Sequence, residues 1–128
     1  NLHHNFDAVV TFDDTGFHKP SKEPFIKISN LLDIPPEYSL MVGDWPERDV
    51  IGAKKLNMKT AFARYGDMFK TVHSGADYDL DDISEIIEII NSQVEFIGSP
   101  IGNKAYNLNC YAYGASRSMG RASLSGGG

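Results

Sequence analysis

The sequence predicts an α/β fold built on a largely parallel sheet. Short runs rich in β-branched and aromatic residues alternate with amphipathic helical patterns through residues 1–92, an arrangement typical of βαβ units. The 128 residues are 41% hydrophobic and 23% charged, which is enough for one modest core. After residue 92 the composition shifts towards Gly and Ser, so residues 93–128 are expected to be a tail, either disordered or packed on the core.

The first strand is predicted over residues 8–12, whose Ala-Val-Val-Thr-Phe sequence is typical of a buried strand. A helix follows over residues 22–32, with Ser21 as its expected N-cap. Pro24 falls in its first turn, where a missing N–H costs little. The apolar side chains expected to face inward are Phe25, Ile28, Leu31 and Leu32.

A second strand and a second helix are predicted next. Residues 39–42 are predicted to form a buried strand that stops at Gly43-Asp44, and Pro46 starts a helix over residues 47–56. Asn57 is expected to adopt a left-handed conformation at the end of that helix. Pro46 and Asn57 therefore mark the two ends of the helix in a second βα unit.

A third strand is predicted over residues 59–63 and a short edge strand over residues 77–80. The last helix has the clearest periodicity, and Asp81 or Asp82 is expected to cap it. The isoleucines spaced to face inward are Ile83, Ile86, Ile87 and Ile90.

Composition excludes several classes of partner. The formal net charge of −5 has the wrong sign for a nucleic-acid-binding surface. No apolar run approaches the roughly 20 residues that a membrane helix needs. The single Cys110 cannot form an internal disulfide, so we expect a cytoplasmic protein that binds neither nucleic acid nor membrane.

The most informative stretch for chemistry is residues 41–49. Its strand would deliver Asp44 to the carboxyl edge of the sheet, where open parallel sheets bind ligands, and Asp49 follows in the first helical turn. Two converging carboxylates with a substrate phosphate would suffice for Mg²⁺, a hard cation that prefers oxygen ligands. The structural alternative is that Asp44 caps the helix and Asp49 complements its dipole.

Lys19 follows the first strand and is expected at the same edge of the sheet. Its ammonium group could neutralise phosphate or reduce repulsion between the carboxylates gathered there. A solvated loop lysine is the alternative that the spacing alone leaves open.

These two motifs, in this order, resemble the C-terminal half of the haloacid dehalogenase (HAD) superfamily, which consists mostly of Mg²⁺-dependent phosphatases. The resemblance covers roughly residues 5–92. Lys19-Pro20, with Phe25 six residues after the lysine, is similar to the third motif of the family. Gly43-Asp44 followed by Asp49 is similar to its fourth motif.

The resemblance implies a partial Rossmann-like (HAD-like) parallel sheet with flanking helices, and roles for three residues. Lys19 would be the catalytic, phosphate-side lysine, which stabilises the nucleophile and the transferring phosphoryl group. Asp44 and Asp49 would hold Mg²⁺, which offsets charge on the phosphoryl oxygens. The implied reaction is phosphomonoester hydrolysis through an aspartyl-phosphate, with a phosphorylated small molecule as substrate.

The first two motifs of the family have no match in the sequence. The family places a nucleophilic Asp at the end of its first strand and an acid–base Asp two residues later, whereas Asp13 and Asp14 are adjacent and lie shortly before Lys19. We therefore interpret residues 12–16 as a polar loop. The expected function is that of a fragment, inactive or nearly so by itself.

The sheet order of the family would leave the missing strands at the centre of the sheet, between residues 8–12 and 39–42. Either an upstream N-terminal half supplies them by complementation, or the chain rearranges its sheet and fills the gap with residues 94–113. Two functional alternatives stay open. One is a non-catalytic interaction module that binds a partner or itself through an open sheet edge, and the other is a minimal phosphatase that uses Asp13 or Asp14.

Overall fold

The computed structural model describes residues 6–96, 109–112 and 118–122, and it has an α/β fold. The strands are β1 (Phe6–Thr11), β2 (Ser39–Gly43), β3 (Lys59–Ala63), β4 (Tyr78–Leu80), β5 (Asn109–Ala112) and β6 (Ser118–Ala122). The helices are α1 (Phe12–Thr15), α2 (Lys22–Leu32), α3 (Ile51–Lys54) and α4 (Ile86–Phe96). Shorter turns are the 3₁₀ turns η2 (Pro36–Tyr38), η4 (Arg64–Gly66) and η5 (Ile83–Glu85), and the π-helical turn η3 (Pro46–Val50).

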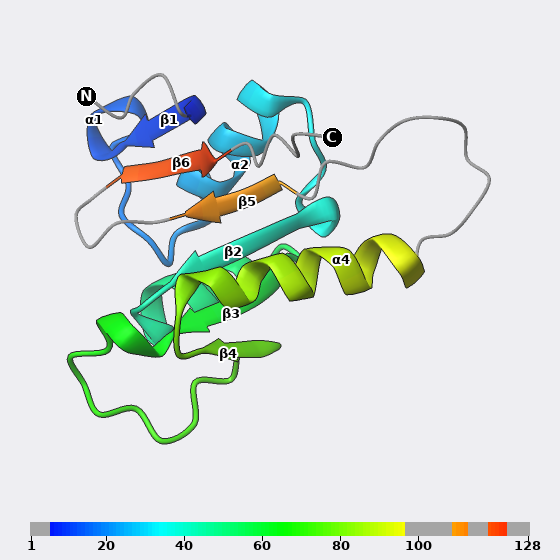
Figure 1. Cartoon of the computed structure of the whole chain (residues 1–128). Coiled ribbons are helices and arrows are strands. Elements are labelled where there is room, and N and C mark those ends of the chain that lie inside the picture. Colours follow the sequence, from blue (N-terminus) through cyan, green and yellow to red (C-terminus); the bar gives the residue numbers. More distant parts are fainter. Residues whose placement is uncertain (1–5, 97–108, 113–117, 123–128) are drawn as a thin grey trace.

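The described strands form one six-stranded sheet in the order β1-β6-β5-β2-β3-β4 (Figure 1). The neighbours β5, β2, β3 and β4 are parallel, as the sequence predicts for a Rossmann-like sheet. The strand β6 differs, because it runs antiparallel to both β5 and β1.

Two hydrophobic clusters cover opposite faces of the sheet, because successive side chains of a strand point to opposite sides. In β2, Met41 packs with α2 and α3 on one face, while Leu40 and Val42 pack with α4 on the other. Figure 1 shows α4 crossing in front of β2 and β3, with α2 behind the sheet. All five residues of β2 are buried, so the strand that leads to Asp44 lies at the centre of the core.

The strand β1 does not pair with β2 in the described structure, because β5 and β6 lie between them. β5 falls within the segment 94–113 that the sequence offers for this gap, and β6 lies beyond it. Residues 94–96 of that segment end α4, and residues 97–108 and 113 lie outside the described residues. The place in the sheet between β1 and β2, where the family resemblance implies missing strands, is therefore occupied by β5 and β6.

The helix predicted over residues 22–32 is confirmed with the same bounds, but two details differ. Ser21 stands at the N-cap, yet its hydroxyl donates to the Glu23 carboxylate at 2.6 Å instead of accepting from a helix amide. Leu31 is 54% exposed, whereas Phe25 and Ile28 are fully buried. The apolar spacing alone did not distinguish the buried face from its border.

The last helix buries a different set of isoleucines from the one predicted. Ile86 is 5% exposed and packs with the partly buried Ile89 and Ile90, but Ile83 and Ile87 are about half exposed. Residues 83–85 form a 3₁₀ turn, which has three residues per turn and therefore shifts the phase of Ile83 relative to α4. Asp82 caps this turn, as predicted, by accepting a hydrogen bond from the Ser84 amide at 2.9 Å.

The segment after Asp44 is less regular than the predicted helix over residues 47–56. It consists of the π-helical turn η3 and the four-residue α3. Asn57 has the predicted left-handed conformation, with φ of 60°. None of the described helices has the length and apolar character needed to cross a membrane.

Candidate active site

The structure brings Lys19, Asp44 and Asp49 together at the carboxyl end of β2. Asp44 follows the last residue of β2, Asp49 lies in η3, and Lys19 lies in the loop between α1 and α2. Gly43 permits this arrangement, because a Cβ built on it would lie only 2.5 Å from the Asp49 Cγ. The Asp49 carboxylate therefore lies directly against the backbone of β2.

Lys19 and Asp49 form a buried ion pair. The Lys19 Nζ donates to the Asp49 Oδ1, and the two side chains are only 4% and 1% exposed. The other oxygen, Asp49 Oδ2, accepts a hydrogen bond from the Trp45 amide at 3.1 Å. The alternative of a solvated loop lysine is therefore wrong, and both carboxylate oxygens of Asp49 are held in place.

Burial lowers the pKa of the Lys19 amine to about 8, although the charge of Asp49 and its hydrogen bond oppose this shift. The positive charge of Arg48 lowers it further, and Asp44 raises it. Near pH 7 the amine is still mainly protonated, so Lys19 carries a cation into a buried site.

Asp44 is the more accessible carboxylate of the pair. Burial raises its pKa, and the negative charges of Asp49 and Asp67 act in the same direction. Gly66 lies against it, since a built Cβ there would be 2.5 Å from the Asp44 Oδ2. The turn η3 begins after Trp45 without any side-chain cap, so the expectation that Asp44 caps this helix is not met.

The two carboxylates match the number that Mg²⁺ uses when phosphate and water supply its other ligands. Within the described residues, no group of three or more His, Cys, Asp or Glu side chains is placed to hold a metal ion. Burial, and then the charge of Asp49, raise the pKa of Asp44, so a cation bound beside it would favour its charged form. The donor set thus fits a magnesium ion that shares its coordination with a phosphate, and it fits no all-protein metal cage.

Asp13 and Asp14 form part of a short helix, not the predicted polar loop. The Asp14 carboxylate accepts hydrogen bonds from the Thr11 amide at 2.5 Å and the Thr11 hydroxyl at 2.9 Å, which lower its pKa. Thr11 and Asp14 thereby make a capping box for α1, a sequence signal that was overlooked. The structure gives Asp14 a local structural partner, and no described hydrogen bond or ion pair joins it to Asp44 or Asp49.

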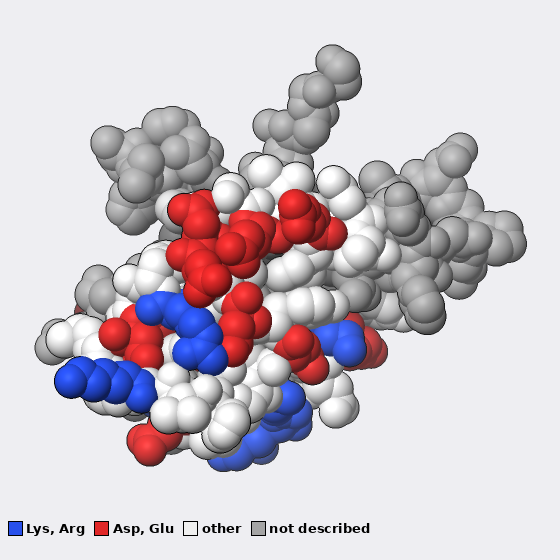
Figure 2. All heavy atoms as spheres, turned by 60° about the horizontal axis from the view of Figure 1, so that its bottom comes forward, with Lys and Arg blue, Asp and Glu red and all other residues white. Residues whose placement is uncertain are grey.

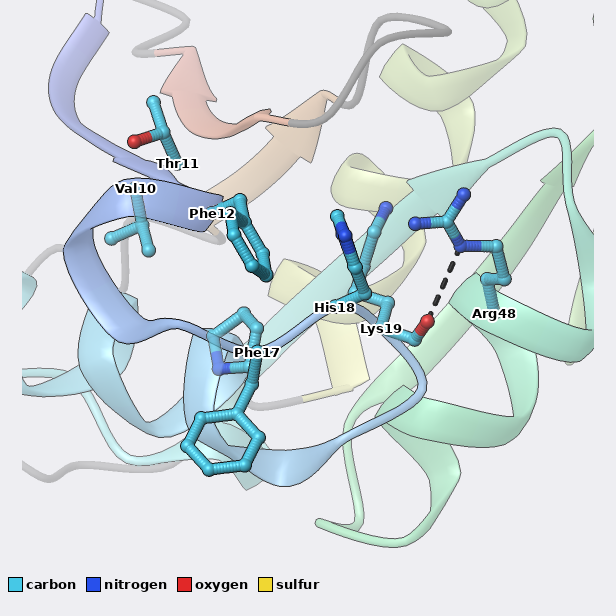
Figure 3. A pocket seen from close by; sticks show the side chains of 8 residues that line it. Val10, Thr11, Phe12, Phe17, His18, Lys19 and Arg48 are labelled. Carbon is cyan, nitrogen blue, oxygen red and sulfur yellow. Dashed lines mark hydrogen bonds between the residues drawn. The ribbon is translucent and has the colours of Figure 1, made fainter.

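The sequence alone did not predict the contacts that Arg48 makes. Its Nε donates to the Lys19 carbonyl oxygen at 3.2 Å, and its guanidinium carbon lies 4.8 Å from the centroid of the Trp45 ring. Arg48 also lines a pocket with His18 and Lys19 (Figure 3). The spacing of Trp45 and Arg48, three residues apart at a predicted helix start, was the available signal for their contact.

The face that comes forward when the bottom of Figure 1 is turned towards the viewer carries mixed charge (Figure 2). Figure 2 shows acidic side chains gathered into one area, with basic side chains beside and between acidic ones. On the described part of this face the basic side chains do not form one continuous surface.

Known proteins resemble this chain in sequence. Residues 1–63 match the family of haloacid dehalogenase-like hydrolases. The chain is 37% identical over 90 residues to pyrophosphatase PpaX of Bacillus cereus strain G9842, an alignment that covers 68% of this chain and 41% of that protein. It is also 37% identical over 89 residues to pyrophosphatase PpaX of Bacillus mycoides strain KBAB4. The chain thus spans about two fifths of the length of these curated relatives.

Solved structures of proteins named HAD phosphatase and haloacid dehalogenase also match this chain. A HAD phosphatase from Thermococcus onnurineus is 32% identical, with a TM-score of 0.55, over 63% of this chain and 37% of that chain. A 2-haloacid dehalogenase from Pseudomonas syringae pv. Tomato DC3000 shares the fold at 22% identity, with a TM-score of 0.53, over 61% of this chain and 34% of that chain. The matches in sequence and in structure therefore support the assignment of this chain to the haloacid dehalogenase-like hydrolase superfamily.

Proposed function

We propose that this chain is part of a Mg²⁺-dependent phosphohydrolase, in which residues 1–92 form the C-terminal half of a HAD-like core domain. The observation that carries this proposal is the buried Lys19–Asp49 pair beside Asp44 at the carboxyl end of a central parallel strand. The relatives are named pyrophosphatases, so inorganic pyrophosphate is the first phosphorylated small molecule to test as a substrate.

Each of the three residues has a distinct proposed role. Asp44 offers an accessible carboxylate and Asp49 an immobilised one, and together they would hold Mg²⁺, which supplies charge compensation on phosphoryl oxygens when bound. Lys19, held by Asp49, would place its ammonium group beside the transferring phosphoryl group. An arrangement that is fixed before substrate arrives needs little reorganisation during the reaction.

The proposed reaction passes through an aspartyl-phosphate whose attacking carboxylate is supplied by the first motif of the family, outside the residues described here. An N-terminal half carrying that motif is the proposed partner, whose strands would take the place that β5 and β6 hold in the described sheet, and the chain alone is proposed to be nearly inactive. We further propose a cytoplasmic protein without nucleic-acid or membrane partners, given its net charge of −5 and single cysteine.

The test has two readouts, metal binding and turnover. We expect Mg²⁺ to raise the thermal midpoint of the chain, and Asp44→Asn to abolish this rise without loss of the circular dichroism spectrum. The exposed Asp81→Asn is the matched control and should leave the rise unchanged. An Mg²⁺ response that survives Asp44→Asn would contradict the proposed site.

Turnover separates the fragment from a minimal phosphatase. Hydrolysis of p-nitrophenyl phosphate should be absent from the folded chain with or without Mg²⁺. Metal-dependent turnover that is lost in Asp14→Asn would instead show that the nucleophile lies within this chain, and it would overturn the fragment proposal.

A second candidate is the interaction module that associates through a sheet edge. The sheet order places β1 and β4 at its two ends, and exposed apolar side chains gather in the loop after β3, where Met68 is 87% and Val72 75% exposed. Light scattering over a range of concentrations tests this candidate, because a constant monomer mass contradicts self-association.

A further inference from the structure

A pocket beside the two carboxylates has a basic lining. The ionisable side chains among its described lining residues are His18, Lys19 and Arg48, and none is a carboxylate. Phe12, Phe17 and Pro24 contribute apolar walls. Figure 3 shows the His18 ring, the Lys19 side chain and the Arg48 guanidinium group pointing to the same side of the pocket.

The Arg48 guanidinium group is fixed in position from two sides. The 3.2 Å hydrogen bond from its Nε to the Lys19 carbonyl crosses from η3 to the loop that carries Lys19. The Trp45 ring lies against the group, with 4.8 Å between ring centroid and guanidinium carbon. A preorganised guanidinium loses little conformational freedom when it binds a ligand.

The two cations of the pocket differ in their charge compensation. Lys19 is paired with Asp49. For Arg48, no carboxylate of the described residues lies within ion-pair distance, and the described contacts use only its Nε as a donor. Both terminal amino groups, Nη1 and Nη2, therefore offer donors in the fork geometry that matches phosphate.

His18 lines the same pocket as Lys19 and Arg48 (Figure 3). Its ring stacks on the Phe12 ring with 4.1 Å between centroids and an interplanar angle of 19°. The stacking holds the imidazole at the pocket, and an imidazole N–H is a donor suited to an anion.

We propose that Arg48 and His18 form a second phosphate-binding position next to Lys19, which selects substrates whose leaving group is itself a phosphate. This inference rests on the proposed function, because Lys19, together with a Mg²⁺ held by Asp44 and Asp49, would bind the phosphate that is transferred. The two phosphates of an anhydride share one bridging oxygen, so their binding positions must be adjacent. The backbone carbonyl of Lys19 accepts the hydrogen bond from Arg48, and Figure 3 shows both cationic side chains on the same side of the pocket, so the two positions lie next to each other.

The test compares a diphosphate probe with a single phosphate by isothermal titration calorimetry at fixed free Mg²⁺. Methylenediphosphonate, whose P–C–P bridge cannot be hydrolysed, is the first probe, and orthophosphate is the second. We expect the parent chain to bind the diphosphonate about tenfold or more tightly than orthophosphate, the order of one charge-assisted hydrogen bond. Arg48→Gln should lower this affinity ratio about tenfold, by loss of the same interaction.

Two further variants control the comparison. Lys55→Gln removes the same charge from an exposed side chain near the end of α3 and should leave both affinities unchanged. Arg48→Lys keeps the charge but loses the fork, so its affinity ratio should fall between those of the parent and Arg48→Gln. It also replaces Arg48→Gln as the test if the latter does not give a folded circular dichroism spectrum.

The outcomes separate this inference from the proposed function. An unchanged ratio in Arg48→Gln, or an equal loss of affinity for both probes, overturns the second phosphate position. Orthophosphate binding by the parent chain without any preference for the diphosphonate also overturns it, but leaves the phosphohydrolase proposal intact. A folded parent chain that binds neither probe contradicts both.

Discussion

Asp49→Asn should destabilise the chain by about 3 kcal/mol, because it removes one charge of a buried ion pair. The Lys19 and Asp49 side chains are 4% and 1% exposed, so solvent cannot compensate the remaining lysine. Breaking a buried pair by removing one partner costs roughly 3–5 kcal/mol. Asparagine keeps the shape and one oxygen acceptor, which puts the expected cost at the lower end of that range.

The pair Lys54–Asp77 provides the matched control. Its atoms are 3.9 Å apart and its side chains are 44% and 33% exposed, so Lys54→Gln should cost less than about 1 kcal/mol. The double variant Lys19→Met/Asp49→Leu should be more stable than the sum of its single variants predicts, by about 2 kcal/mol or more, because no charge is left buried without a partner.

Urea unfolding at pH 7, followed by circular dichroism, measures these differences. With a slope of about 1.5 kcal/mol per M, the Asp49→Asn midpoint should fall by roughly 2 M. The reasoning is refuted if Asp49→Asn lies within about 0.5 kcal/mol of the parent chain, or if the two single effects simply add in the double variant.

Three other predictions concern the site and the core. Gly43→Ala places a methyl group 2.5 Å from the Asp49 Cγ. We therefore expect the free energy of unfolding to fall by about 1–3 kcal/mol and the Mg²⁺-dependent rise in thermal midpoint to become smaller. An unaltered rise would show that the close approach is not required. Ile86→Ala should cost about 2–4 kcal/mol in urea unfolding and Ile87→Ala less than about 0.5 kcal/mol, because only the first side chain is buried; equal costs would contradict the observed helix phase. Burial raises the pKa of the Asp77 carboxyl, but two hydrogen bonds from a β3 threonine outweigh this effect and lower the pKa from 3.8. The contribution of Asp77 to stability is therefore present above pH 3.8 and is lost as the pH falls through the lowered pKa. Asp77→Asn should therefore flatten the acid side of the stability–pH profile, and an unchanged slope would count against this assignment.

Local patterns explain which elements were predictable. The helix over residues 22–32 and the strands near residues 39–42 and 59–63 are confirmed, because apolar periodicity, Pro and Asn act over a few neighbouring residues. Predictions that depended on which apolar side chain meets the sheet were less accurate. Leu31 and Ile87 fit the helical spacing, yet both are 54% exposed.

Errors in the remaining elements have equally local causes. Residues 12–15 are helical because Thr11 and Asp14 cap one another, a signal that the polar composition obscured. The helix expected over residues 47–56 is shorter because it starts as a π-helical turn, where the Pro46 carbonyl accepts from the Ile51 amide, five residues further on.

The sequence by itself determined that two carboxylates and a lysine gather at the carboxyl edge of the sheet. A strand that ends in Gly43-Asp44 must deliver its carboxylate to the carboxyl edge, and this follows from chain direction alone. Only the tertiary structure decided that Lys19 is buried against Asp49, 30 residues away, and that Arg48 is anchored to the Lys19 carbonyl. The insertion of β5 and β6 between β1 and β2 was likewise decided by strand pairing. Such contacts join residues far apart in the chain, and their free energy depends on burial and on partners that no local pattern encodes.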